Sequence, residues 1–166
     1  HHELVHAYIN DVYYGGSVQS IMQNNIQLVF PLWFEEGLAE YLALMWDTNT
    51  DMFMRDATLN NYLPPLTGLR GYFAYRGGQA FWYFIADQYG RPKITEILQR
   101  IKTTRNIQQS LVQSLGLNVE ELSERWQEYW KQRYFPEVAN RQSLNSIATQ
   151  VTTRANSGSY NTSPSI

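Results

Sequence analysis

The chain has 166 residues, no cysteine, and only three histidines, which are His1, His2 and His6. The lack of cysteine excludes a disulfide framework, a thiolate metal site and a cysteine nucleophile, and any site that uses histidine has to lie at the amino-terminal end. Hydrophobic residues at 43% and charged residues at 17% indicate a globular chain, and the net charge of −2 offers no basic surface for nucleic acid. No apolar run approaches the roughly 18 residues of a membrane helix.

Apolar residues recur at helical spacing along most of the chain, and Gly, Pro and Asn stand where helices would begin and end. The sequence therefore predicts a mainly α-helical domain. The expected helices, in chain order, are one that reaches about Tyr14 and stops at Gly15-Gly16, then residues 34–46, 51–62, 73–89, 92–102 and 106–115, and a last one that reaches about Tyr134. A capping box at Asn118 and Glu121 opens the last helix, and the Gln/Asn-rich stretch 17–27 has room for a short one.

The composition changes beyond Pro136, where aromatic residues become rare and Ser, Thr and Asn dominate. Residues 1–135 are therefore interpreted as the domain and residues 136–166 as a linker or tail. Residues 147–152 alternate as a strand would, but the chain offers them no strand partner. The glycosylation sequon at 161–163 is attributed to chance.

The amino terminus carries the motif His2-Glu3-Leu4-Val5-His6. On a helix, residues four apart lie on one face about 5–6 Å from each other, so both imidazoles can reach one metal ion. Glu3 is turned by about 100° from His2, which places its carboxylate beside such an ion, as a base for a bound water. The alternative is a pair of surface imidazoles or the remnant of a tag.

A catalytic zinc ion usually takes three protein ligands and one water. His1 is five residues from His6 and faces elsewhere on the helix, so no histidine or cysteine remains for the third position. The third ligand therefore has to be an oxygen, and the best candidates lie in the segment 31–41. Glu36 and Glu40 share one face of a predicted helix and are favoured, whereas Glu35 is more typical of an exposed acidic stripe. Such a stripe is also the alternative for all three. Gly37 inside this helix costs about 1 kcal/mol relative to Ala, which indicates a close approach of another backbone.

These two motifs together resemble the gluzincin metallopeptidases, and most closely the branch of aminopeptidase N and the peptidase-MA-like domains of bacterial proteins. The resemblance is carried by His2-Glu3-x-x-His6 and Trp33-x-x-Glu36-Gly37-x-Ala39-Glu40-Tyr41. It implies one zinc ion held by His2, His6 and Glu36, with Glu40 orienting His2 from behind and Glu3 as the general base. The spacing from His6 to Glu36 is longer than in aminopeptidase N-type enzymes, so the intervening loop differs.

A second element of the same branch is Tyr-x-x-Gly, whose tyrosine hydroxyl stabilises the oxyanion. Tyr75-Arg76-Gly77-Gly78 matches it, which makes Tyr75 a candidate catalytic residue and Tyr72 the second choice. A hydroxyl donor opposite the zinc is also what the chemistry needs, since no histidine is spare. With 12 tyrosines in the chain, a core or surface role for Tyr75 is the alternative.

The resemblance also implies features that lie outside this chain. Family members have a β-sheet ahead of the zinc helix, so we expect the chain to be the helical part of a thermolysin/gluzincin-like catalytic domain that lacks the sheet. Residues 148–153 and 160–166 resemble the start of a blade of the Tol-type β-propellers that follow such domains. An extracytoplasmic location in a bacterium is the corresponding expectation.

The sequence therefore predicts a zinc metallopeptidase that acts on a peptide or protein substrate through a zinc-activated water. Two alternatives remain from other classes of protein. One is a catalytically inactive, peptidase-like binding or assembly module that keeps the zinc helix, and the other is a helical interaction domain without a metal.

Overall fold

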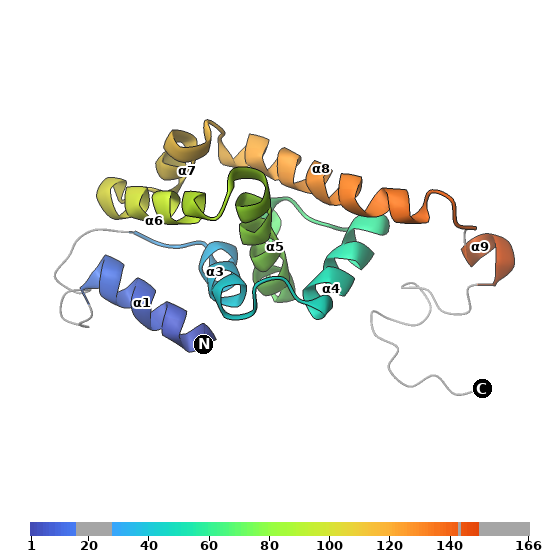
Figure 1. Ribbon diagram of the computed structural model, residues 1–166, viewed down its shortest axis with the longest axis horizontal. Coiled ribbons are helices and arrows are strands. Elements are labelled where there is room, and N and C mark those ends of the chain that lie inside the picture. The colour runs from blue at the N-terminus through green and yellow to red at the C-terminus, as the bar shows by residue number, and fades with distance from the viewer. Residues whose placement is uncertain (16–27, 143, 150–166) are drawn as a thin grey trace. The chain divides into compact units, whose positions relative to one another are not determined.

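The computed structural model describes residues 1–15, 28–142 and 144–149 (Figure 1). The described residues are mainly helical and contain no strand, which confirms the expected mainly α-helical class. The elements in chain order are α1 (His2–Tyr14), α3 (Leu32–Leu44), α4 (Thr48–Leu59), the 3-10 turn η1 (Leu66–Gly68), α5 (Tyr72–Tyr89), α6 (Pro92–Thr104), α7 (Ile107–Leu115), α8 (Val119–Val138) and α9 (Leu144–Ile147). The stretch 17–27, which has room for a short helix, lies outside the described residues.

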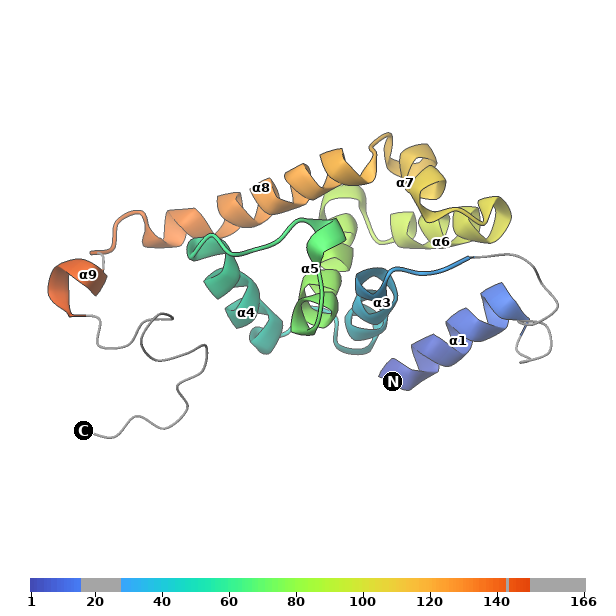
Figure 2. The same ribbon diagram turned by 180° about the vertical axis from the view of Figure 1, so that it is seen from behind.

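The chain divides after Tyr134 into two compact units, residues 1–134 and 135–166. Within the first unit α5 is central, since α3, α4 and α6 all pack against it, while α1 packs on α3 (Figures 1 and 2). Large aromatic side chains fill the core between these helices, and Phe34, Phe81 and Trp82 are fully buried. The indole nitrogen of Trp82 donates to the carbonyl oxygen of Phe34 at 2.9 Å, which ties α5 to α3. The aromatic run on α5 therefore serves the core.

Several helices begin or end at the glycines and capping residues that the sequence indicates. α1 ends at Gly15, whose φ of 73° is the left-handed conformation that glycine adopts readily. The capping box at the start of α8 is present, because the Glu121 N–H donates to Oδ1 of Asn118 and the Asn118 N–H donates to the Glu121 carboxylate. α4 begins at Thr48, earlier than expected, because the side chain of Asp47 caps it.

The carboxyl-terminal part differs from the expectation in one helix end. α8 continues past Pro136 to Val138 instead of ending at about Tyr134, and a helical hydrogen bond from Ala139 N–H to Phe135 O follows the proline. Ile147, the first residue of the alternating stretch 147–152, is the last residue of α9, and no strand begins there. Residues 150–152, the sequon at 161–163 and the propeller-like segment 160–166 lie outside the described residues.

None of the helices in the described part of the chain combines the length and the apolarity needed to cross a membrane.

Two glycines allow α3 and α5 to approach each other at backbone distance. A Cβ atom added to Gly37 would lie 2.2 Å from the carbonyl carbon of Gly78, and one added to Gly78 would lie 2.1 Å from the carbonyl oxygen of Trp33. The obstacles are backbone atoms, which cannot move aside as a flexible side chain can. The close approach expected from Gly37 is therefore present, and its partner is Gly78.

We expect Gly37→Ala and Gly78→Ala each to lower the free energy of unfolding by about 3 kcal/mol or more, at the upper end of overpacking effects, because the helices have to separate. Chemical denaturation measures this. Gly68→Ala is the matched control, since its Cβ would meet the nearest atom at 3.4 Å, an ordinary contact. Equal stability of Gly78→Ala and Gly68→Ala would contradict the close helix contact.

Asp47 links the start of α4 to α5. Its Oδ1 accepts from the N–H groups of Asn49 and Thr50, and its Oδ2 accepts from Nε2 of Gln79 at 2.8 Å. Burial raises the pKa of Asp47, but the hydrogen bonds from Gln79, Thr50 and Asn49 outweigh it, so the pKa lies below its ordinary value. The ionised form of Asp47 therefore stabilises the folded state.

Asp47→Asn keeps an N-cap oxygen but loses the negative charge, and we expect it to cost about 1 to 2 kcal/mol at neutral pH. Because the folded-state pKa is depressed, this stabilisation is present above the unfolded-state pKa of about 3.9 and disappears as the pH falls through the folded value. Urea unfolding of both proteins between about pH 7 and pH 2.5 should show the difference shrinking below about pH 4. A difference that stays constant down to the lowest pH would be the contrary result.

Candidate metal centre

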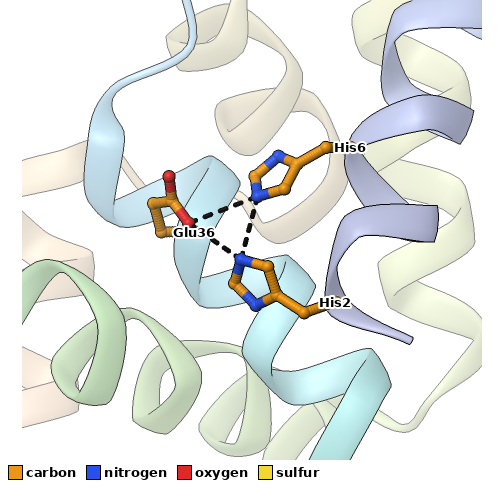
Figure 3. A group of neighbouring side chains, drawn as sticks. All are labelled: His2, His6 and Glu36. Atoms are coloured by element: carbon orange, nitrogen blue, oxygen red, sulfur yellow. Dashed lines mark hydrogen bonds and ion pairs between the residues drawn. The ribbon is translucent and has the colours of Figure 1, made fainter.

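The two histidines of α1 are presented to α3 by a helix that is anchored at its other end. Tyr13 is buried, and its hydroxyl donates to the carbonyl oxygen of Leu98 on α6 at 2.7 Å. Arg105 donates to the carbonyl oxygen of Tyr13 at 2.6 Å. These contacts hold the carboxyl-terminal end of α1, so its first turns face α3 with His2 and His6 on the same side (Figure 3).

One atom from each of three side chains converges between α1 and α3 (Figure 3). Nε2 of His2 and Nε2 of His6 are 3.0 Å apart, and Oε2 of Glu36 lies 3.1 Å from the first and 3.2 Å from the second. Among the described residues, this is the group of His, Cys, Asp and Glu whose donor atoms are close enough to share a metal ion. The three side chains are 17–25% exposed, so the site is accessible from solvent.

Both imidazoles have a carboxylate beside Nδ1. Nδ1 of His6 lies 3.3 Å from Oε1 of Glu35, and Nδ1 of His2 lies 2.9 Å from Oε1 of Glu40. The contact of His2 is within ion-pair distance, but it does not meet the geometric criteria of a hydrogen bond. A carboxylate at Nδ1 favours the tautomer with the proton on that nitrogen, which leaves Nε2 as an acceptor.

The converging atoms are therefore two imidazole lone pairs and a carboxylate oxygen, all of which are acceptors. Acceptors held about 3 Å apart repel one another unless a proton or a metal cation lies among them. In tetrahedral coordination at 2.0–2.1 Å, two zinc ligands are separated by about 3.3 Å, close to the spacing seen here. The residues present thus fit a zinc ion in both geometry and donor chemistry, and His2, His6 and Glu36 are the ones that could hold it.

Tyr75, at the start of α5, lies beside this group. Its ring is nearly parallel to that of His2, with 6.4 Å between the centroids. The negative charge of Glu36 raises the pKa of the Tyr75 hydroxyl, and burial and a hydrogen bond with the same carboxylate add to the effect. Since the ordinary pKa of tyrosine is already about 10, the Tyr75 hydroxyl is a protonated donor at neutral pH. The second choice, Tyr72, points elsewhere: it is 56% exposed, and its hydroxyl accepts from Nε of Arg76.

Glu3 and His1 flank the first histidine. Glu3 lies in the first turn of α1 with an exposed side chain, and its charge is one of those that raise the pKa of Tyr75. His1 is exposed, precedes α1, and does not belong to the converging group. The structure thus brings together five residues, His2, His6, Glu36, Glu40 and Tyr75. The side chain of Glu3 is exposed, one residue after His2.

Two residues of the site were missed or misjudged from the sequence. Glu35 was interpreted as part of an exposed stripe, yet its carboxylate lies beside Nδ1 of His6. The sequence could have indicated this contact, because each metal-binding imidazole needs a hydrogen-bond acceptor for its second ring nitrogen. Arg76 was seen only as part of the Tyr-x-x-Gly element, although it is the one basic residue of α5, and its guanidinium lies 2.7 Å from Glu40.

A comparison of the chain with models of protein families, with curated protein sequences and with solved structures finds no match. The resemblance to gluzincins therefore rests on the motif residues alone.

Proposed function

We propose that the chain is the helical part of a zinc-dependent metallopeptidase of the gluzincin type, with His2, His6 and Glu36 as the metal ligands. The observation that carries the proposal is the convergence of three acceptor atoms from α1 and α3 within 3.2 Å of one another. A structural zinc site usually has four protein ligands, whereas three leave a position open for water and substrate. In this proposal the β-sheet wall of the catalytic domain belongs to a segment outside this chain.

In this proposal, different residues of the chain have different roles in peptide hydrolysis. When bound, a zinc ion supplies Lewis acidity, which lowers the pKa of water towards about 7 and polarises a carbonyl group. Glu3 accepts a proton from the attacking water and returns it to the leaving amine. Its exposed position beside His2 leaves it accessible to both.

The remaining residues orient the ligands and stabilise charge. Glu40 and Glu35 hold the imidazoles of His2 and His6 with Nε2 facing inward. The hydroxyl of Tyr75, which lies beside the ligands, donates a hydrogen bond to the oxygen that becomes negative as the peptide carbonyl is attacked.

Metal binding is tested first. We expect the full-length protein to retain one zinc ion per chain after dialysis, and His6→Ala or Glu36→Ala to lose it, because each removes one of three donors. Elemental analysis measures the zinc content. His1→Ala is the matched control, since it removes a neighbouring imidazole that is not a ligand, and it should keep the metal. A wild-type protein without zinc, or equal loss in His1→Ala, would contradict the ligand set.

The general base is tested separately. Glu3→Gln should keep its zinc ion but lose about 10²- to 10⁴-fold in the rate of peptide cleavage, because the amide cannot accept the proton. Cleavage of a broad peptide library identifies a substrate, and the rates are then compared on it. Glu120→Gln removes an exposed carboxylate from the first turn of α8 and is the control. Zinc without cleavage by the wild-type protein would favour the inactive binding module.

A further inference from the structure

Arg76 lies on the second turn of α5 and reaches side chains of two other elements. Its Nη1 atom is 2.7 Å from Oε2 of Glu40 on α3 and 3.2 Å from Oγ1 of Thr50 on α4. The same atom is 3.1 Å from Oε1 of Gln79, and Nε donates to the hydroxyl of Tyr72. Only 17% of the side chain is exposed, so the guanidinium is held in one place by contacts on several sides.

The carboxylate of Glu40 is shared between this arginine and the candidate metal centre. Its Oε1 lies 2.9 Å from Nδ1 of His2, and its Oε2 accepts from Arg76. One oxygen of the Glu40 carboxylate thus faces His2, and the other faces Arg76. The orientation of the carboxylate determines where Oε1 lies, and therefore which way the His2 ring is turned.

The other partners of Arg76 have hydrogen bonds of their own. Nε2 of Gln79 donates to the carbonyl oxygen of Met45 and to Asp47, and the hydroxyl of Thr50 is within hydrogen-bond distance of both Asp47 and Gln79. By contrast, in the part of the chain that the structure describes, Arg76 is the cation paired with Glu40. Nη1 of Arg76 also lies 3.8 Å from Oδ2 of Asp47 in that cluster, a longer contact than the 2.7 Å to Glu40. Asp47 keeps its hydrogen bonds from the backbone N–H groups at the start of α4 and from Gln79 when the guanidinium is lost. Removing the guanidinium therefore affects the Glu40 carboxylate more than it affects the polar cluster.

We propose that Arg76 is a positioning residue of the metal centre, which fixes the Glu40 carboxylate and, through it, the His2 imidazole with Nε2 facing the metal. This inference rests on the proposed function. Arginine suits the role because its planar fork bonds to several partners in fixed directions, whereas lysine is a single flexible point charge. Carboxylates behind metal-binding histidines typically contribute 10- to 100-fold to metal affinity, and Arg76 acts on that contribution.

The first test measures zinc affinity, which does not depend on activity. Arg76→Met keeps the length of the side chain but loses the guanidinium. We expect its zinc dissociation constant to rise about 10-fold, the low end of the effect of losing a direct partner of a metal-bound histidine, because Arg76 acts through Glu40. Competition with a chromophoric chelator measures the constant on the full-length protein. Arg55→Met is the matched control, because Arg55 is paired with Asp51 on α4, away from the ligands. It should change zinc affinity by less than about twofold, since independent sites do not couple.

A double-mutant cycle shows whether Arg76 acts through Glu40. Glu40→Gln alone should weaken zinc binding, and adding Arg76→Met to it should weaken binding little further, because the contact has already been lost. Additive effects would mean that Arg76 acts by another route and would overturn the proposal. Thermal unfolding of the metal-free proteins reports the purely structural contribution of Arg76 separately.

The remaining outcomes are also decisive. If Arg76→Met does not fold, Arg76→Lys replaces it, and a dissociation constant between those of the wild type and Glu40→Gln is expected. Wild-type affinity in Arg76→Lys, or in a folded Arg76→Met, overturns the positioning role and leaves the zinc site standing. A wild-type protein that binds no zinc overturns both proposals, whereas one that binds zinc without cleaving peptides overturns only the proposed activity.

Discussion

The backbone contact between α3 and α5 at Gly37 and Gly78 is the constraint on which the site depends. Because neither glycine has a Cβ, the two helices meet at a distance that no other pair of residues would permit. The glutamates that flank Gly37 on α3 are thereby brought beside the residues that precede Gly78 on α5. Tyr75 reaches Glu36 and Arg76 reaches Glu40 for this reason, and a wider helix separation would break both contacts.

The three glutamates of α3 have different roles because of where the helix turns each of them. Glu36 contributes the converging oxygen, while Glu35 and Glu40 lie behind His6 and His2 respectively. A single helical segment thus supplies an acceptor to each imidazole and a carboxylate to the centre. The negative charge that gathers here is balanced from α5 by Arg76, whose guanidinium lies against Glu40.

Much of the fold followed from local signals. Glycines and caps marked the ends of α1, α5 and α8 to within a few residues, because they act through neighbouring backbone groups alone. The alternation of residues 147–152 could not decide their structure, because a strand needs a pairing partner that the sequence does not offer, and Ile147 is the last residue of α9. The first residue of α4 was missed because its cap, Asp47, was not recognised as one.

The sequence by itself determined the supply of ligands. With no cysteine and histidines only at the amino terminus, any metal site built around His2 and His6 needed an acid as its third donor, and helical spacing put both imidazoles on one face. Tertiary structure decided which acid converges with them, which carboxylates stand behind them, and that Arg76 lies against Glu40. These pairings join residues about 30 or more positions apart. They depend on how α1, α3 and α5 pack, and no local spacing encodes the distance between two helices.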